Sequence, residues 1–233
     1  MNVKLAEHFY SIQGEGPTAG HPALFMRFQK CNLHCESDQW VCDTLEQMKH
    51  RYNFDLEKDV IKDWGKLDRT NRIIFTGGEP MMYQSQIAEI IDFITQSGRL
   101  AYTPNIEIET NGTQLISEHL KGMEIQFNCS PKLSNSGNSK QMRYNLAALN
   151  RIANTKGSIF KFVIATEQDR NELLSDFDWL FKYYSDKIWL MPAGLSRSQQ
   201  WLSAPVVAQL AMDLNVKLAL RNHIMIWDTK KGV

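Results

Sequence analysis

Short apolar runs alternate with longer amphipathic stretches along most of this chain, and this alternation most constrains its fold. Runs rich in Ile, Val and Phe predict strands at residues 23–28, 72–75, 105–109, 124–128, 159–164, 187–190 and 216–220. Stretches with helical character predict helices at residues 55–64, 85–95, 115–120, 144–153, 168–183 and 204–214. Strands that alternate with helices favour βα units around a parallel sheet.

These units number about six or seven, fewer than those of a closed βα barrel, which takes roughly 250 residues. The chain has 233 residues, and no internal repeat or linker divides it. We therefore expect an α/β fold, an incomplete (partial) βα barrel, in a single domain over residues 1–233.

The charge balance excludes some classes of protein. The 26 basic residues equal the 26 acidic ones, which argues against binding nucleic acid through bulk charge. No apolar run approaches the roughly 18 residues of a membrane span. The first residues include an early acid and no apolar core, so they do not resemble a signal peptide. We expect a cytoplasmic protein without a nucleic acid or membrane partner.

Cysteine usage points to a metal site. Cys31, Cys35 and Cys42 lie within one loop, residues 31–42, and Cys129 lies apart. In a reducing compartment such a cluster favours metal binding over disulfides. Three thiols are one fewer than a closed zinc site or an ordinary ferredoxin cluster requires. Cys129 is expected to be a small buried residue.

Polar or glycine-containing segments follow nearly every predicted strand, at residues 31–42, 76–80, 109–112, 129–132, 191–194 and near 223. Taken singly, each has an ordinary interpretation as a turn, a helix cap, a loop or a structural histidine. Because the carboxyl ends of parallel strands meet at one rim, together they predict a single site. The polar segment 134–140 is expected to be a mobile loop.

Two further features suit a small polar ligand. Glycines on both sides of Glu15 allow close backbone approach, and Gln13 and Glu15 offer hydrogen bonds to a heterocycle edge. Arg27 interrupts an apolar run, which is costly unless the charge is paired. It forms either a structural ion pair or a fork for a ligand carboxylate, and the second is slightly favoured.

The three-cysteine loop followed by Thr76-Gly77-Gly78-Glu79-Pro80 resembles the radical S-adenosylmethionine (SAM) superfamily, in which three thiolates hold a 4Fe-4S cluster. The C-x3-C-x6-C spacing here has four residues more than the superfamily's usual C-x3-C-x2-C. Together with residues 9–16, Arg27, residues 42–44, 109–112 and 130–132, and His223, the chain resembles the 7-carboxy-7-deazaguanine synthase family of that superfamily.

That resemblance implies a radical SAM lyase that converts 6-carboxy-5,6,7,8-tetrahydropterin to 7-carboxy-7-deazaguanine with loss of ammonia, in 7-deazapurine (queuosine-type) biosynthesis. The implied cofactors are the 4Fe-4S cluster, S-adenosyl-L-methionine, which is re-formed, and Mg²⁺. The implied partners are the pterin substrate, a reductant such as flavodoxin or ferredoxin, and a second copy of the chain in a homodimer.

The resemblance also implies the residue roles. The cluster ligands are Cys31, Cys35 and Cys42, and the Mg²⁺ ligand is Thr44, which would otherwise be interpreted as a helix cap. The substrate residues are Ile12, Gln13, Gly14, Glu15, Arg27, Thr76 and His223. The SAM residues are Val41, Cys42, Asp43, Gly78, Glu109, Ser130, Pro131, Lys132, Met191, Pro192, Ala193 and Gly194.

Two other functions remain open from the sequence. A glycyl-radical activase would share the cluster and the Gly-Gly-Glu-Pro loop, but should lack the small-molecule set Gln13, Glu15, Arg27 and His223. A non-enzymatic zinc protein would use the three cysteines of the loop with His34 as a fourth ligand.

Overall fold

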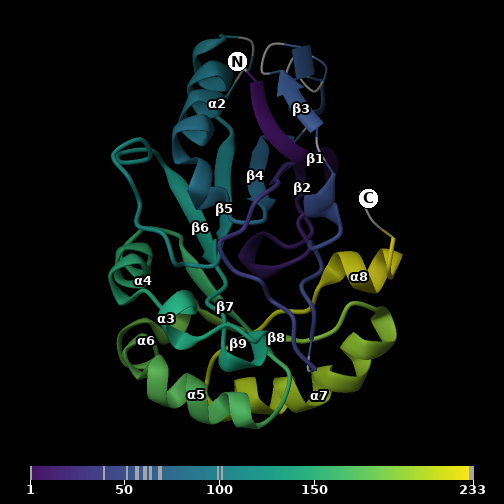
Figure 1. Ribbon diagram of the computed structural model, residues 1–233, viewed down its shortest axis with the longest axis vertical. Coiled ribbons are helices and arrows are strands. Elements are labelled where there is room, and N and C mark those ends of the chain that lie inside the picture. The colour runs from purple at the N-terminus through teal and green to yellow at the C-terminus, as the bar shows by residue number, and fades with distance from the viewer. Residues whose placement is uncertain are drawn as a thin grey trace.

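The computed structural model describes residues 2–38, 40–50, 52–55, 58–59, 62, 65–67, 70–98, 100 and 102–230. These residues form one nine-stranded sheet in the order β3-β1-β2-β4-β5-β6-β7-β8-β9, with helices along its outer side (Figure 1). The strands are β1 (Asn2–Ile12), β2 (Pro22–Phe28), β3 (Tyr52–Asp55), β4 (Arg72–Gly77), β5 (Asn105–Thr110), β6 (Ile125–Cys129), β7 (Ile159–Ile164), β8 (Ile188–Pro192) and β9 (Lys217–Leu218).

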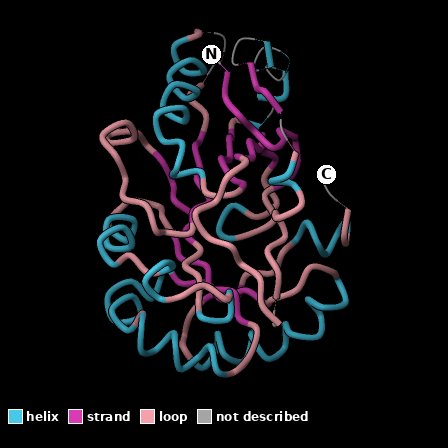
Figure 2. The backbone as a smooth tube through the Cα atoms, viewed as in Figure 1, coloured by secondary structure: helices cyan, strands magenta, loops and turns pink. Residues whose placement is uncertain are grey.

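The helices are α2 (Gln84–Gln96), α3 (Lys140–Arg143), α4 (Leu146–Ala153), α5 (Gln168–Asp176), α6 (Asp178–Tyr184), α7 (Arg197–Asp213) and α8 (Asn222–Trp227). The described part of the loop from β2 to β3 has turns, one isolated bridge between Glu36 and Val41, and one 3-10 helix, and the loop appears as a long irregular segment in Figure 2. No helix in the described ranges is long and apolar enough to cross a membrane.

Strand directions confirm the incomplete barrel. Each neighbouring pair from β2 to β9 is parallel, whereas β1 runs antiparallel to both β2 and β3. Among the described residues, β3 and β9 each pair on one side only, so the sheet is open. An open sheet leaves one rim accessible to the loops that follow the strands.

The two faces of the sheet differ in chemistry. Ile73 and Phe75 of β4 belong to the main core, together with Ile90 and Ile94 of α2. Ile74, between them, faces the other way and joins a small cluster with Ala23 and Phe25. Alternate strand residues point to opposite faces, so the remaining positions on this second face are free for polar side chains.

All seven predicted strands are confirmed, although the last shrinks from residues 216–220 to Lys217–Leu218. β1 and β3 were not predicted. β1 escapes a search for apolar runs because one of its faces carries polar residues such as Glu7 and Ser11.

The helix predictions fared less evenly. α2 and α4 are confirmed; α7 begins earlier than predicted, and the stretch 168–183 divides at Phe177 into α5 and α6. The helix predicted at 115–120 is wrong, because residues 115–117 are irregular and residues 118–120 form a turn. Of the helix predicted at 55–64, Lys58, Asp59 and Lys62 are helical and Asp55 belongs to β3, while the other positions lie outside the described residues. The helices α3 and α8 were not predicted.

Candidate active site

One cavity of about 260 Å³ opens at the carboxyl ends of the parallel strands. Strand residues at alternate positions line it: Glu7, Phe9, Ser11, Phe25, Arg27, Thr76, Glu109, Asn128, Lys161, Val163 and Met191. Of the residues predicted to bind cluster, Mg²⁺, SAM or substrate, all except the buried Pro131 line this cavity. Cys129 is fully buried and is not among the lining residues.

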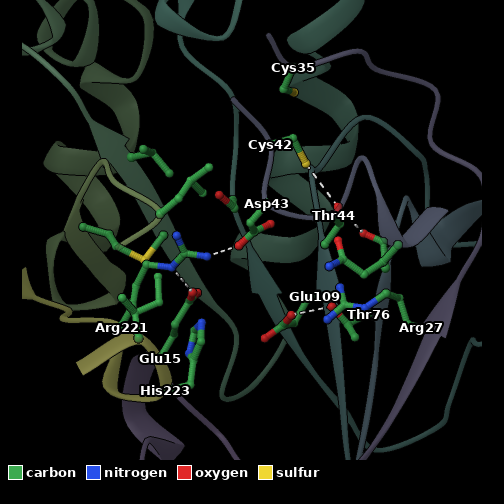
Figure 3. A pocket seen from close by; sticks show the side chains of 18 of the residues that line it. Glu15, Arg27, Cys35, Cys42, Asp43, Thr44, Thr76, Glu109, Arg221 and His223 are labelled. Atoms are coloured by element: carbon green, nitrogen blue, oxygen red, sulfur yellow. Dashed lines mark hydrogen bonds and ion pairs between the residues drawn. The ribbon is translucent and has the colours of Figure 1, made fainter. Parts of the chain in front are cut away.

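The cysteine loop folds back on itself. Glu36 and Val41 form an isolated antiparallel bridge, and the backbone N–H of Cys42 donates to the carbonyl of Cys35 at 2.9 Å. The four residues that exceed the usual spacing are therefore accommodated in a small hairpin. The hairpin returns Cys42 to the neighbourhood of Cys35, and both thiols reach the upper end of the cavity in Figure 3.

The thiols lie in a partly buried setting. Burial raises the pKa of Cys31 to about 11, and burial also raises the pKa of Cys35. The ammonium of Lys132 opposes both increases. A cationic metal centre would reverse this preference, because a coordinated thiol is deprotonated.

The loop does not resemble a single-ion site. No three His, Cys, Asp or Glu side chains in the described ranges converge to hold one metal ion. His34, the fourth ligand of the zinc alternative, is 72% exposed and pairs with Glu36 at 2.9 Å. A cubane cluster takes its thiolates on separate iron atoms, so three cysteines spread around one cavity fit it.

The Gly-Gly-Glu-Pro loop packs directly on the start of the cysteine loop. A Cβ atom on Gly78 would lie 2.1 Å from the carbonyl oxygen of Lys30, so only glycine fits there. Glu79 is fully buried and accepts from the hydroxyl of Thr110 at 2.6 Å and the backbone N–H of Asn111 at 2.7 Å. This loop therefore holds the cysteine loop and the end of β5 together.

A charged network crosses the other side of the cavity (Figure 3). Glu15 pairs with Lys161 at 2.6 Å and with Nε of Arg221 at 3.0 Å. Arg221 also pairs with Asp43, next to Cys42, and donates to the carbonyl of Gly194 at 3.0 Å. Arg221 thus links the N-terminal segment, the cysteine loop and the tip of β8.

Neither Lys161 nor Arg221 was predicted. Lys161 is a charged residue inside an apolar strand, which is the same sequence feature that singled out Arg27. Burial acts to raise the pKa of Glu15, but the cations of Lys161 and Arg221 outweigh it and hold that pKa well below its ordinary value. Burial likewise opposes the charge of Lys161, but Glu15 raises the pKa of that lysine to about 12.

His223 lies on α8 rather than at a strand tip. Burial lowers its pKa to about 4, and the nearby cation of Arg221 acts in the same direction. The imidazole is therefore neutral at pH 7, with one nitrogen that donates and one that accepts.

Arg27 forms an ion pair inside the sheet and also lines the cavity. Its Nε donates to Glu7 at 2.8 Å, and its guanidinium carbon lies 5.8 Å from the centroid of the Phe9 ring. Among the described residues no partner takes its two terminal nitrogens, and the side chain lines the cavity. Glu7 therefore orients a guanidinium whose fork remains available.

Glu109 connects two predicted residue sets. It was predicted to bind SAM, but it accepts from Thr76 at 2.6 Å and from Gln13 at 3.2 Å, both predicted for substrate. Lys161 lies 4.0 Å away. The two predicted binding regions therefore meet at Glu109.

The hydroxyl of Thr44 lies 3.1 Å from Sγ of Cys42 and 3.5 Å from the carbonyl oxygen of Gly77. The helix-cap interpretation lacks support, because the 3-10 helix that follows (Gln47–Lys49) has Glu46 at its N-cap position.

A model for the 4Fe-4S single cluster domain family matches residues 12–142. The 7-carboxy-7-deazaguanine synthase of Clostridium acetobutylicum is 30% identical over 244 residues and matches 100% of both chains. That of Halobacterium salinarum is 26% identical and matches 97% of this chain and 91% of the relative. The crystal structure of QueE from Escherichia coli shares the fold, with a TM-score of 0.66 at 20% identity, and the match covers 96% of this chain and 95% of that one.

Proposed function

This chain belongs to the 7-carboxy-7-deazaguanine synthase family of radical SAM enzymes, and from that premise we propose how its own cavity performs the family's reaction. The enzyme converts 6-carboxy-5,6,7,8-tetrahydropterin to 7-carboxy-7-deazaguanine with loss of ammonia, in 7-deazapurine biosynthesis. One observation carries the residue assignments: a single cavity is lined both by three cysteines and by groups suited to a carboxylated pterin.

Cys31, Cys35 and Cys42 hold the 4Fe-4S cluster, and Cys129 does not, because it is buried away from the cavity. When bound, the cluster and SAM would supply radical chemistry at carbon 6 of the substrate. The chain's own residues position these groups and exclude water.

The residues proposed to bind SAM come from several segments around the cavity. They come from the cysteine loop (Val41, Cys42, Asp43), from the loops after β4, β5 and β6 (Gly78, Glu109, Ser130, Pro131, Lys132) and from the tip of β8 (Met191, Pro192, Ala193, Gly194). All of them except Pro131 line the cavity, which supports the proposal. Pro131 contributes by shaping the loop between its two neighbours.

Arg27 binds the substrate carboxylate. Its terminal nitrogens face the cavity while Glu7 holds Nε at 2.8 Å, so the fork is oriented before the ligand arrives. Thr76 is the register partner of Arg27 across β2 and β4, which places both residues at the same level of the sheet (Figure 3).

The pterin edge lies against Ile12, Gln13, Gly14, Glu15 and His223. Glu15 stays ionised at neutral pH because Lys161 and Arg221 surround it, so its carboxylate accepts from ring N–H groups. Neutral His223 offers one donor and one acceptor without adding charge.

Thr44 is the protein ligand for Mg²⁺. Its hydroxyl lines the cavity beside Cys42, and Mg²⁺ takes few protein ligands and fills its shell with water and substrate oxygens. Thr44→Ala should blunt the stimulation of turnover by Mg²⁺, whereas Thr44→Ser, which keeps a hydroxyl, should restore it. Full stimulation in Thr44→Ala would remove Thr44 from the site.

The remaining assignments concern partners. We propose that residues 1–233 act as one cytoplasmic domain, that the chain is a homodimer, and that a flavodoxin or ferredoxin supplies the electron. Light scattering on the purified protein tests the dimer. Reduction of the loaded enzyme by each donor, followed through the cluster absorbance, tests the reductant.

The alternatives are not supported. A glycyl-radical activase should lack the small-molecule set, yet Gln13, Glu15, Arg27 and His223 all line the cavity with the cysteines. The zinc alternative needs His34, which points to solvent.

The decisive experiment reconstitutes the protein anaerobically and supplies the carboxylated pterin, Mg²⁺, dithionite and less SAM than substrate. We expect 7-carboxy-7-deazaguanine and ammonia in amounts that exceed the SAM added, because SAM is re-formed. Cys42→Ala is the matched control and should give no product. A fully loaded wild-type enzyme that forms no product would contradict the proposed function.

A further inference from the structure

Residues 134–140, expected to be a mobile loop, contain three buried polar side chains and form a wall beside the cysteine loop. Asn135, Ser136 and Asn138 are 5%, 0% and 9% exposed. Burying three polar side chains in one short segment is costly unless each is hydrogen-bonded. Their partners therefore show what the segment does.

Asn135 and Asn138 find partners in the cysteine loop, whereas Ser136 bonds to Leu133 and Asn138, close by in the chain. A Cβ atom on Gly137 would lie 2.5 Å from the carbonyl oxygen of Glu36, so the two backbones are in direct contact. The backbone carbonyl of Asn135 accepts from the hydroxyl of Ser37 at 2.6 Å, and its side-chain oxygen accepts from the indole N–H of Trp40 at 3.0 Å. The wall thus braces the hairpin between Cys35 and Cys42.

Asn138 reaches a cysteine itself. Its Oδ1 accepts from the backbone N–H of His34 at 3.2 Å, which fixes the orientation of the amide because a backbone N–H can only donate. The amide nitrogen then faces Sγ of Cys35 at 3.4 Å, and it also donates to the carbonyl of Ser136 at 3.2 Å. The hydroxyl oxygen of Ser136 lies 3.3 Å from the same nitrogen, so one amide hydrogen is directed to Cys35 and the other to Ser136.

A second asparagine gives a useful comparison. Nδ2 of Asn111 lies 3.9 Å from Sγ of Cys31, but it donates to Oδ1 of Asn32 at 3.0 Å. Of the two asparagines, Asn138 makes the closer approach to a thiol, whereas the hydroxyl of Thr44 lies 3.1 Å from Cys42.

We propose that Asn138 is a positioning residue for the 4Fe-4S cluster, which donates an N–H···S hydrogen bond to the Cys35 thiolate and thereby raises the reduction potential of the cluster. Reduction adds negative charge to the cluster and its sulfurs. A hydrogen-bond donor aimed at a ligand sulfur stabilises the reduced form more than the oxidised form. The inference rests on the proposed role of Cys35 as a cluster ligand.

The test measures the midpoint potential of the reconstituted enzyme by redox titration monitored with electron paramagnetic resonance. Asn138→Asp keeps the acceptor for His34 but replaces the donor with a carboxylate oxygen. Asn138→Ala removes the donor without adding charge. Asn135→Asp is the matched control, because it makes the same change in the same segment, where Oδ1 binds Trp40 and Nδ2 binds the carbonyl of Val163 rather than a sulfur.

We expect the midpoint potential to fall in Asn138→Ala and further in Asn138→Asp, at wild-type iron content, while Asn135→Asp stays close to wild type. An unchanged potential in both Asn138 variants, or an equal fall in Asn135→Asp, would overturn the inference. If Asn138→Asp fails to load iron, Asn138→Ala decides alone. Wild-type iron content in Cys35→Ala would instead show that the proposed ligand set has failed.

Discussion

Gly14 and His223 are in direct contact in the cavity lining: a Cβ atom on Gly14 would lie 1.9 Å from Nδ1 of His223. The two residues are joined by a further link, since the backbone N–H of Asn222 donates to the carbonyl of Gly14 at 2.9 Å. The N-terminal segment therefore sets the position of α8, and with it the imidazole.

Gly14→Ala should displace His223 and weaken pterin binding. A displacement of a positioned group can cost on the order of 100-fold in rate, so we expect kcat/KM for the pterin to fall by about 10- to 100-fold. Iron content and SAM affinity should not change. Gly65→Ala is the control, because a Cβ atom there meets nothing within 4 Å. Wild-type kinetics in Gly14→Ala would show that the contact has no role.

The pKa of His223 predicts a loss of stability in mild acid. In the unfolded chain a histidine takes up a proton near its ordinary pKa of 6.5, whereas the folded protein keeps His223 neutral down to about 4. The free energy of unfolding is therefore highest above pH 6.5 and falls as the pH drops toward 4, by about 2 kcal/mol between pH 7 and pH 5. Denaturant unfolding of wild type and His223→Gln at both pH values measures it; equal losses in the two proteins would contradict it.

Lys161→Met should destabilise the fold. It would leave the buried carboxylate of Glu15 with Arg221 as its remaining cation, and breaking a buried ion pair costs roughly 3–5 kcal/mol. Because Arg221 still pairs with Glu15, we expect a value near the lower end. Lys156→Met, the same change at an exposed position, should have little effect in the same unfolding experiment. Equal stability in the two variants would argue that the pair contributes nothing.

Arg27→Lys should keep the charge but lose the fork. A charge-assisted hydrogen bond is worth about 1.5–3 kcal/mol, so pterin affinity should weaken by roughly 10- to 150-fold while SAM affinity is unchanged. Glu7→Gln should weaken pterin binding less, because it removes only the partner that orients Arg27. Calorimetric titration with pterin and with SAM separates the two ligands, and an Arg27→Lys enzyme with wild-type pterin affinity would refute the role.

Single alanine replacements of the cysteines should separate ligands from core. We expect loss of iron in Cys31→Ala, Cys35→Ala and Cys42→Ala. These variants should also lose the broad absorbance at roughly 400 nm that iron–sulfur charge transfer gives. Cys129→Ala should keep both, although burial makes some loss of stability expected. Loss of iron in Cys129→Ala with retention in Cys42→Ala would reverse the assignment.

The sequence alone determined the features that depend on contiguous residues. The apolar runs of β4, β5 and β7 and the helical spacing of α2 are local patterns, so their elements were predictable. The cysteine triplet and the Gly-Gly-Glu-Pro loop are likewise short segments, and their function could be inferred from the sequence without knowledge of the fold. The topology rule for parallel strands then placed their tips on one rim.

Only the tertiary structure decided which distant residues pair. Arg221 meets Asp43 across 178 residues and Lys161 meets Glu15 across 146, and no local pattern encodes either contact. The burial of residues 134–140 has the same cause. Their polar composition alone predicts a mobile loop, but the cysteine loop supplies hydrogen-bond partners that offset the cost of burying polar groups. Polarity is a local property of the sequence, but whether a polar group is satisfied depends on what the fold brings beside it.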